Sequence, residues 1–361
     1  MIGFGQNVNI PDANFKAYLV GEPLINTNGD SEIQLSEATA FSGSIACNNM
    51  NISDLTGIEE FTALTLLHCD QNQLTSLDVS NNNALAKLWC DENQLTSLDV
   101  SQNIALTVLI CKDNQLTSLD VSNNNALTNL QCDDNQITSL DVSQNIALTT
   151  LTCEHNQLTS LDVSQNTALD NLQCHFNQLT SFDVSQNTAL YYLNCRSNQL
   201  TSFDVSQNTA LTFLSCGGNQ LTSLDVSNNT ALTMLKFYDN QLTNLDVSSN
   251  TALTYLSCYN NQLTSLDVSN NNALTNLQCY DNQLTSLDVR NGNNMNMFTS
   301  YNFFNLTNNP QLYCINVDDV AWADTNWTVA NGNIDSTMSF STNCSTAFGC
   351  LDPLACNYDS L

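Results

Sequence analysis

A unit of 21 residues, repeated in tandem, constrains this chain more than any other feature. One copy reads LTSLDVSQNTALDNLQCHFNQ, from Leu158 to Gln178, and copies run from Leu74 to Gln283 without insertion or deletion. Each copy holds two similar halves, ALTxLxCxxN and LTSLDVSxN, as in Ala84 to Asn93 and Leu95 to Asn103. Because one unit cannot bury its apolar face alone, the copies must stack into a solenoid.

The spacing within the unit predicts short strands. In Leu88-Trp89-Cys90 and Leu98-Asp99-Val100, apolar residues alternate with other types, as expected of strands with one buried face. Stacked copies lie about 4.8 Å apart, the separation of paired strands. Equivalent side chains then form inward columns, which in one copy are Leu85, Leu88, Cys90, Leu95, Leu98 and Val100. Two columns of Asn close the turns, because a buried amide can satisfy backbone groups there.

Both halves follow the pattern LxxLxϕxxN, where ϕ is Cys or Val, so the chain resembles the bacterial leucine-rich-repeat proteins of the 21-residue LxxLxCxxNxLxxLDLxx class. The resemblance extends from Cys47 to Val289, with Val79, Val100 and their equivalents in place of the last Leu. It implies a β-rich leucine-rich-repeat solenoid of parallel strands, about 12 coils of 21 residues, between a short helical N-terminal cap and a C-terminal cap. It says little about function, because such repeats serve many ligands.

The expected domains follow the repeat. Residues 1–43 form an N-terminal cap, in which Pro11 suits the first turn of a helix from Asp12 to Val20. Residues 44–289 form the solenoid, residues 290–344 a C-terminal capping region that Trp322 and Trp327 seal, and residues 345–361 a truncated module with Cys and Asp.

Charge excludes several classes of partner. The chain has six Lys or Arg against 35 Asp or Glu, a net charge of -29, which argues against nucleic acid and anionic membranes. No stretch reaches the roughly 18 apolar residues of a membrane span, and no complete signal peptide is present. The three His residues sit on separate copies and no catalytic motif is found, so we expect no enzyme.

Fifteen cysteines fall into two groups. Eleven share one core column, where Phe237 replaces Cys in one copy; this favours small buried apolar residues over a column of metal-binding thiolates. The other four are Cys314, Cys344, Cys350 and Cys356, an even number that suggests an oxidising compartment. Three pairings are open, and we favour Cys314 with Cys344 and Cys350 with Cys356.

One stretch of the N-terminal cap resembles the loop of an EF-hand calcium site. Oxygen-bearing residues recur at the ligand spacing and end in a Glu that can bind through both oxygens. The expected ligands of Ca2+ are Asn26, Asn28, Asp30, Glu32 through its carbonyl, Gln34 and Glu37. Ser31 replaces the usual Gly, and the alternative is a polar turn between two short helices.

The copies differ from one another at the outward positions of the first half, whereas LTSLDVS is nearly invariant. The variable positions read Leu66, His68, Asp70 and Gln71 in the first regular copy. Aromatic and basic residues collect there, and exposed Tyr or Trp side chains are suited to contact. Drift at unconstrained surface positions is the alternative. The predicted ligand-binding residues are Trp89, Phe176, Tyr192, Arg196, Phe213, Lys236, Tyr238, Tyr255, Tyr259 and Tyr280.

The second half carries a column of Asp, from Asp78 to Asp288. Neighbouring carboxylates about 5 Å apart would repel by roughly 0.8 kcal/mol in water. Local bonds from a backbone amide or from a hydroxyl such as Ser80 would offset this repulsion. A cation-binding stripe and an ice-binding surface are the alternatives.

These features predict a non-catalytic, secreted or cell-surface bacterial protein for binding or adhesion, which recognises a protein or glycan through the variable strand. The alternative is a structural subunit of a surface layer or filament, for which self-association with concentration or calcium would be the sign.

Overall fold

The structure is a computed structural model and describes residues 6–347. It is a solenoid of parallel strands with about 14 turns of ~21 residues, which confirms the predicted fold class. The predicted number of about 12 turns was too low, because the degenerate stretches beside the regular repeats also form turns. The chain divides into two compact units, Met1–Ala189 and Leu190–Leu361.

The first unit opens with a helical cap. Helix α1 (Ala13–Gly21) has Asp12 as its N-cap, whose Oδ1 accepts hydrogen bonds from the amides of Asn14 and Phe15. Pro11 therefore lies before the cap and not in the first turn, a correction of one residue. Helix α2 (Leu35–Ala40) follows, and a 3-10 turn, η1 (Ile58–Glu60), precedes the regular repeats.

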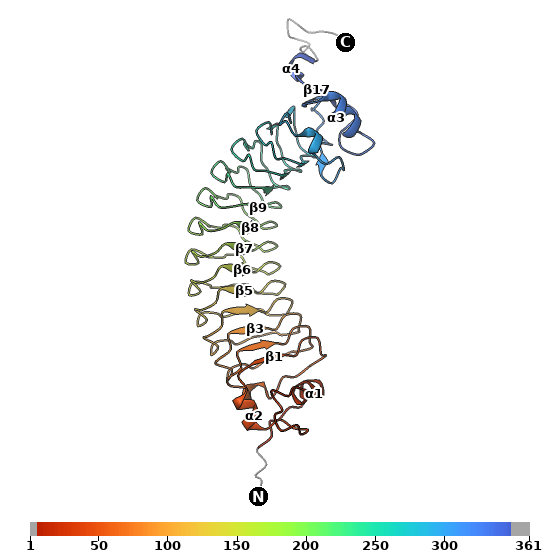
Figure 1. Cartoon of the computed structure of the whole chain (residues 1–361). Coiled ribbons are helices and arrows are strands. Elements are labelled where there is room, and N and C mark those ends of the chain that lie inside the picture. Colours follow the sequence, from red (N-terminus) through yellow and green to blue (C-terminus); the bar gives the residue numbers. More distant parts are fainter. Residues whose placement is uncertain (1–5, 348–361) are drawn as a thin grey trace. The chain divides into compact units, whose positions relative to one another are not determined.

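The first unit contains seven strands of three residues, the first of them before η1, and successive strands pair in parallel (Figure 1). They are β1 (Ser44–Ala46), β2 (Leu66–His68), β3 (Lys87–Trp89), β4 (Val108–Ile110), β5 (Asn129–Gln131), β6 (Thr150–Thr152) and β7 (Asn171–Gln173). Their register advances by one repeat per strand, so that Leu88 pairs with Leu109 and Leu109 with Leu130.

The second unit continues the pattern with two parallel sheets. The first sheet contains β8 (Tyr192–Asn194), β9 (Phe213–Ser215), β10 (Met234–Lys236), β11 (Tyr255–Ser257), β13 (Asn276–Gln278) and β15 (Phe304–Asn305). The second contains β12 (Ser265–Asp267), β14 (Ser286–Asp288), β16 (Cys314–Asn316) and β17 (Ser339–Ser341). This unit also contains the 3-10 turn η2 (Asn294–Asn296) and the helices α3 (Val320–Asn326) and α4 (Cys344–Ala347).

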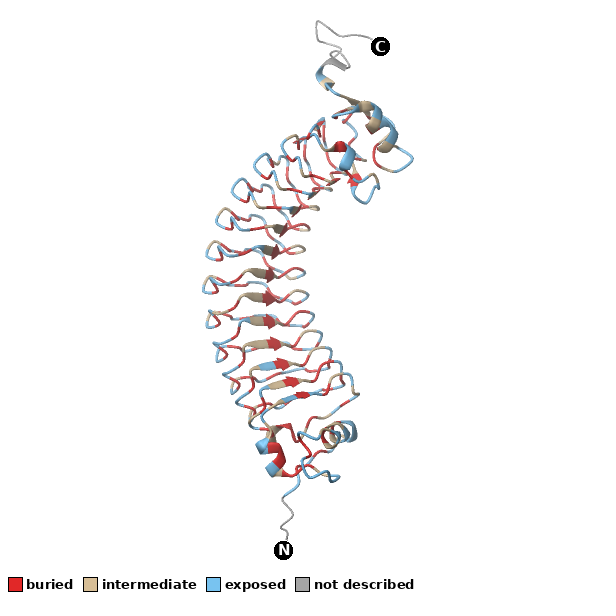
Figure 2. Cartoon of the chain, viewed as in Figure 1, coloured by how far each residue is buried: buried red, intermediate tan, exposed pale blue. Residues whose placement is uncertain are grey.

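The core consists of the predicted inward columns (Figure 2). Leu85, Leu88 and Cys90 are fully buried, and so are their equivalents through the repeats. The eleven column cysteines are free and buried, and burial raises the pKa of the Cys174 thiol well above its usual range. Stacking thus buries in every turn a face that one turn would leave in water.

Asparagines satisfy the backbone at both corners of each turn. The side-chain amide of Asn93 donates hydrogen bonds to the carbonyls of Cys69, Cys90 and Asp91. Its Oδ1 accepts a hydrogen bond from the backbone amide of Leu74 in the preceding turn. Asn103 likewise donates to Val79 and Asn82. Each Asn therefore ties two successive turns together.

The second half of the repeat forms fewer strands than predicted. Asp78 and Asp99 meet only in an isolated bridge, whereas β12 and β14 form a paired ladder. In this half of the repeat, Oδ1 of Asp99 accepts a hydrogen bond from the amide of Ser101 at 2.9 Å, and Asp267 of β12 accepts the same bond from Ser269. The bond to Ser101 lowers the pKa of Asp99. It supports the prediction that local hydrogen bonds offset the repulsion between neighbouring Asp side chains of the column.

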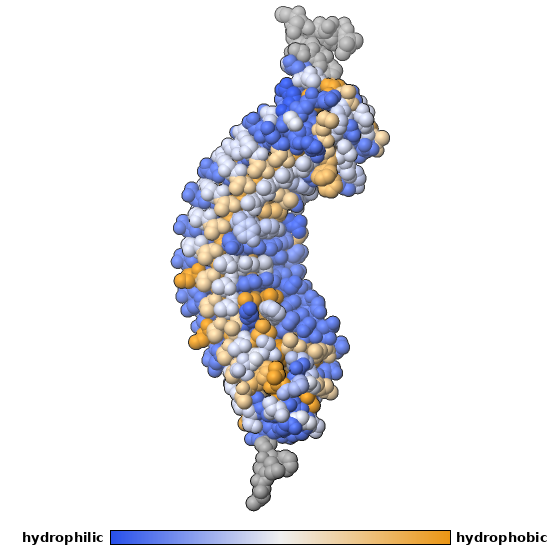
Figure 3. Space-filling model, viewed as in Figure 1, coloured by the Kyte–Doolittle hydropathy of each residue, from blue (hydrophilic) through white to orange (hydrophobic). Residues whose placement is uncertain are grey.

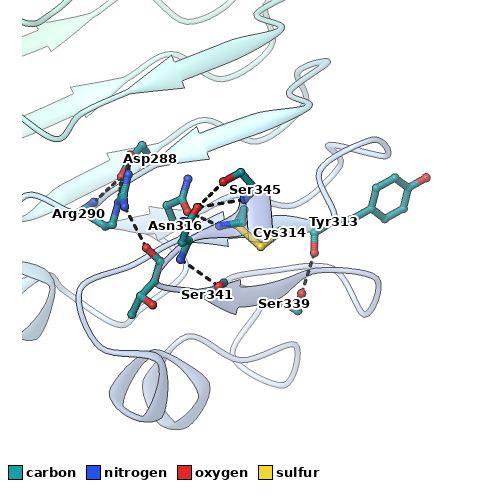
Figure 4. Close-up of a disulfide and its surroundings, with 11 residues drawn as sticks. Asp288, Arg290, Tyr313, Cys314, Asn316, Ser339, Ser341 and Ser345 are labelled. Carbon is teal, nitrogen blue, oxygen red and sulfur yellow. Dashed lines mark hydrogen bonds and ion pairs between the residues drawn. A yellow bond between two sulfur atoms is a disulfide. The ribbon is translucent and has the colours of Figure 1, made fainter. Parts of the chain in front are cut away.

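The C-terminal region is closed by aromatic packing and a disulfide. Trp327 is fully buried and stacks on Phe304 with ring centroids 3.9 Å apart, while Trp322 is half-buried against it. The structure contains the predicted bond between Cys314 and Cys344, which joins β16 to α4 (Figure 4). The predicted Cys350–Cys356 pair lies outside the described residues.

Candidate ligand-binding site

A hollow of about 340 Å³ lies on the outward face of strands β8 to β13 in the second unit. Seven of the ten predicted ligand-binding residues line it. Its walls are Tyr192, Asn194, Arg196, Phe213, Ser215, Lys236, Tyr238, Tyr255, Ser257, Tyr259 and Gln278. An eighth predicted residue, Tyr280, stacks on Tyr259 at its edge. The structure thus places residues from five successive strands or the turns after them around one space.

The aromatic rings of the hollow are stacked in register. Tyr238 and Tyr259 lie 4.7 Å apart between centroids with planes at 4°, and Tyr259 and Tyr280 lie 4.4 Å apart at 7°. Tyr192 and Phe213 stack in the same way at 4.2 Å and 4°. The cause is the repeat itself, because equivalent residues of adjacent turns are separated by the strand spacing, which matches the distance of stacked rings.

Two cationic side chains, Lys236 and Arg196, lie close to these rings. Nζ of Lys236 lies 5.0 Å from the centroid of Tyr255 and 5.7 Å from that of Phe213, within cation–π range. The Arg196 guanidinium lies 3.5 Å from the hydroxyl of Tyr238. Burial, and then the charge of Arg196, lower the pKa of Lys236.

Polar side chains complete the floor. The hydroxyls of Tyr255 and Ser257 both donate to Oε1 of Gln278, at 2.9 and 3.1 Å. Burial raises the pKa of Tyr255 and of Tyr259, so these phenols are neutral donors at ordinary pH. Sequence reasoning missed four residues of the lining: Asn194, Ser215, Ser257 and Gln278. Their position in the repeat could have indicated them, because each is the last residue of its strand.

The other two predicted binding residues belong to the first unit and make their contacts there. Trp89 meets His68 edge to face at 4.5 Å. Phe176 lies 4.3 Å from the ring of His155 and keeps 38% of its surface exposed. Neither is among the residues that line the hollow.

In the first unit the position after the core Cys is acidic in four of seven turns. Asp91, Asp133 and Glu154 occupy the position that Arg196 and Tyr238 occupy in the second unit. Burial, with the charges of Asp133 and Asp134, raises the pKa of Glu154 to about 7. Thr152 donates to Asp133 at 2.8 Å, whereas Oε2 of Glu154 has no hydrogen-bond partner among residues 6–347. Within those residues no group of three or more His, Cys, Asp or Glu could hold a metal.

The predicted calcium loop is closed by its own hydrogen bonds. Oε1 of Glu37 accepts from the amide and hydroxyl of Thr27 and from the amide of Asn28, and Oε2 accepts from the amide of Gln34. These bonds lower the pKa of Glu37 against the effect of burial.

The other expected calcium ligands lie in the same loop. Oδ1 of Asn26, Asn28 and Asp30 accept from the amides of Gly29, Asp30 and Glu32. The Glu32 carboxylate pairs with Lys16 at 2.7 Å, which leaves its carbonyl as the expected ligand. The loop gathers the expected side chains, and calcium binding there stays a prediction.

The surface around these sites is mainly polar. Figure 3 shows apolar residues on the visible face in bands and patches among hydrophilic ones. In the part of the chain that the structure describes, no helix is both long and apolar enough to span a membrane.

Comparisons with known proteins show which proteins this chain resembles. No family model matches the chain. Internalin J of Listeria monocytogenes serotype 4b (strain F2365) is 41% identical over 73 residues, which are 20% of this chain and 8% of Internalin J, so the match spans a small part of that protein. A leucine-rich-repeat protein of Leptospira interrogans superposes with a TM-score of 0.62 at 26% identity, over 79% of this chain and 81% of that chain.

The solved functional domain of InlJ from Listeria monocytogenes, described as including a cysteine ladder, extends the likeness. It has a TM-score of 0.64 and 34% identity over 90% of this chain and 81% of that domain. The eleven stacked cysteines of this chain agree with such a ladder. The chain therefore belongs to the internalin-type leucine-rich-repeat proteins of bacteria.

Proposed function

We propose that this chain is a non-catalytic binding protein, secreted or held at a bacterial cell surface, that takes a protein or glycan ligand in the hollow of its second unit. One observation carries the proposal. Seven of the ten residues singled out as aromatic or basic at positions that vary between copies of the repeat line one hollow. Drift at unconstrained positions would explain the variation between copies but not a run of aromatic residues on neighbouring turns.

The chemistry of the lining favours contact. Tyr rings give area and a polar tip with few rotatable bonds, and they dominate binding sites for that reason. None of the lining residues is His, Asp or Glu, the commonest general acids and bases. Recognition without reaction is the function that such a set supports.

The location rests on the family and on the cap. The chain shares its fold and a third of its residues with an internalin domain, and its C-terminal cap contains a disulfide, which persists in oxidising compartments. Both features favour a protein outside the cytosol.

A screen of the purified protein against a glycan array and defined surface proteins tests the function. The test variant combines Tyr238→Ser, Tyr255→Ser and Tyr280→Ser. The matched control combines Tyr191→Ser, Tyr301→Ser and Tyr313→Ser, three tyrosines of the same unit that are about half exposed and outside the hollow. We expect a ligand that wild type and control capture and the test variant loses, with all three folded by circular dichroism.

Equal capture by all three proteins would move the site away from the hollow. Absence of any ligand, together with assembly on a sizing column as concentration or calcium rises, would favour a structural subunit instead.

A further inference from the structure

The charge of the hollow is opposite to that of the protein. The chain carries six basic residues and a net charge of -29, yet two of the six, Arg196 and Lys236, line this one space. No Asp or Glu is among the residues that line it. The only formal charges on the lining are therefore positive, in a molecule whose surface is otherwise strongly acidic.

Burial disfavours the charged form of Lys236, and no carboxylate of the described residues pairs with it. It forms no ion pair with any residue between 6 and 347, and its described partners are the faces of Phe213 and Tyr255. Burial and the charge of Arg196 both disfavour its charged form, as its lowered pKa shows. An anion bound between the two cations would relieve both effects.

Two acidic residues follow tyrosines of the stack without lining the hollow. Asp239 follows Tyr238 and Asp281 follows Tyr280; burial, and then the charges of Asp281 and Asp239, raise the pKa of Tyr280. Asp239 accepts from Asn260, and Asp281 accepts from Asn308 at 2.8 Å. Arg196 and Lys236 thus line the hollow, while the two acids next to Tyr238 and Tyr280 are not among its lining residues.

We propose that the ligand is an acidic saccharide, a pyranose bearing a carboxylate that lies between Arg196 and Lys236 while its ring rests against the stacked tyrosines. This inference rests on the proposed binding function and narrows it to one class of ligand. The hydroxyls of the sugar would meet Asn194, Ser215, Ser257 and Gln278, which are uncharged donors and acceptors on the floor.

The geometry favours a sugar over an acidic peptide. The rings of Tyr238, Tyr259 and Tyr280 stack on one another and are parallel within 7°, so they offer a pyranose a rigid row of ring edges. A volume of about 340 Å³ is near the lower end for small-molecule sites and holds one or two sugar rings. An extended peptide would instead need side-chain pockets at alternate positions.

Calorimetric titration of the full chain tests the class. The ligands are 3′-sialyllactose, tri-galacturonic acid, neutral lactose and penta-glutamate. We expect one or both acidic sugars to bind at least about tenfold more tightly than lactose, since charge-assisted hydrogen bonds are about twice as strong as neutral ones. The two acidic sugars separate a sialic acid from a uronic acid. Affinity should fall several-fold from low to about 0.5 M salt, where charges are screened.

Two variants locate the anion. Lys236→Gln should lower affinity for the acidic sugar about tenfold and leave lactose unchanged. Lys87→Gln, which changes the net charge equally but lies on β3 of the first unit, should leave both unchanged. Arg196→Lys should retain most binding of the acidic sugar, whereas Arg196→Gln should not. Selective loss cannot arise from misfolding, which would weaken both ligands.

Three results would overturn the inference. They are equal affinity for acidic and neutral sugars, tighter binding of penta-glutamate than of either acidic sugar, and no binding of any acidic sugar at millimolar concentration. A neutral glycan or a peptide captured in the screen, and lost with the three tyrosine substitutions but not with Lys236→Gln, would leave the binding function standing without this ligand class.

Discussion

Gly217 lies against the ring of Tyr238 in the next turn. A Cβ at Gly217 would come within 3.0 Å of three ring atoms of Tyr238, closer than carbon atoms normally approach. Arg196 holds the equivalent position one turn earlier and Tyr238 one turn later. The absence of a side chain at Gly217 therefore gives the tyrosine stack its space at the point where Arg196 reaches the Tyr238 hydroxyl.

Gly217→Ala should disturb this stack. The methyl group must displace the ring of Tyr238, which we expect to cost about 0.5–1.5 kcal/mol, the worth of an aromatic pair, and to weaken ligand binding. Urea unfolding and the near-ultraviolet circular dichroism of tyrosine measure both effects. Gly21→Ala is the control, because nothing lies within 4 Å of that Cβ and Ala raises helix stability by up to about 1 kcal/mol. An unchanged tyrosine spectrum in Gly217→Ala would contradict the packing.

Asn135→Ala should destabilise the solenoid strongly. Its side-chain amide donates to the carbonyls of Cys111, Cys132 and Asp133, and its Oδ1 accepts from the amide of Leu116 at 2.9 Å. Removing it leaves buried backbone groups unpaired, at about 1–3 kcal/mol each, so we expect a total loss of at least about 3 kcal/mol in urea unfolding.

Asn123→Ala serves as the comparison for this prediction. Asn123 is exposed and donates one bond of 3.3 Å to Ser101, so its loss should change stability by less than about 0.5 kcal/mol. Similar costs for the two substitutions would mean that the buried ladder is not the main tie between turns.

Glu154 should make stability depend on pH. Its pKa of about 7 exceeds the ordinary 4.5, so the folded chain binds this proton more tightly than the unfolded chain. Stability therefore falls as pH rises from about 4.5 to about 7, and the melting temperature should be higher at pH 5.5 than at pH 8. Glu154→Gln should flatten that slope. A slope that survives the substitution would assign the effect to other groups.

The Asp column should act in the opposite direction at lower pH. The pKa of Asp99 is lowered by its bonds to Ser101, so its contribution to stability is present above the ordinary 3.8 and is lost as pH falls through the lower folded value. Below about pH 4 the protein should lose stability again, and thermal melts from pH 2 to pH 8 would show a maximum between the two windows.

Calcium should stabilise the N-terminal cap if the loop binds it as predicted. Millimolar calcium would then raise the melting temperature, and Glu37→Gln, which removes the expected bidentate ligand, would abolish the rise. Glu22→Gln, outside the loop, is the control. Identical melting curves with calcium and with a chelator in the wild-type protein would leave Glu37 with a structural role, as an acceptor for Thr27, Asn28 and Gln34.

Much of the fold could be read from the repeat. The columns of Leu, Cys and Asn follow from a period of 21 residues, because stacking puts equivalent residues in contact whatever else the chain does. The strands of the second half were overpredicted, because alternation in Leu98-Asp99-Val100 shows which side chains face inward but not whether adjacent turns pair as a ladder there.

The sequence by itself determined which face of the strands varies and which residues stand on it, because one chain supplies many aligned copies for comparison. Only the tertiary structure decided how these residues group. It brought Arg196, Phe213 and Lys236 around one hollow with the tyrosines and placed Trp89 and Phe176 elsewhere. The physical reason is that a residue's position in the repeat fixes its turn and the direction of its side chain, whereas the packing of that side chain depends on the neighbouring turns. Gly217 is an example, because its lack of a side chain leaves room for the ring of Tyr238.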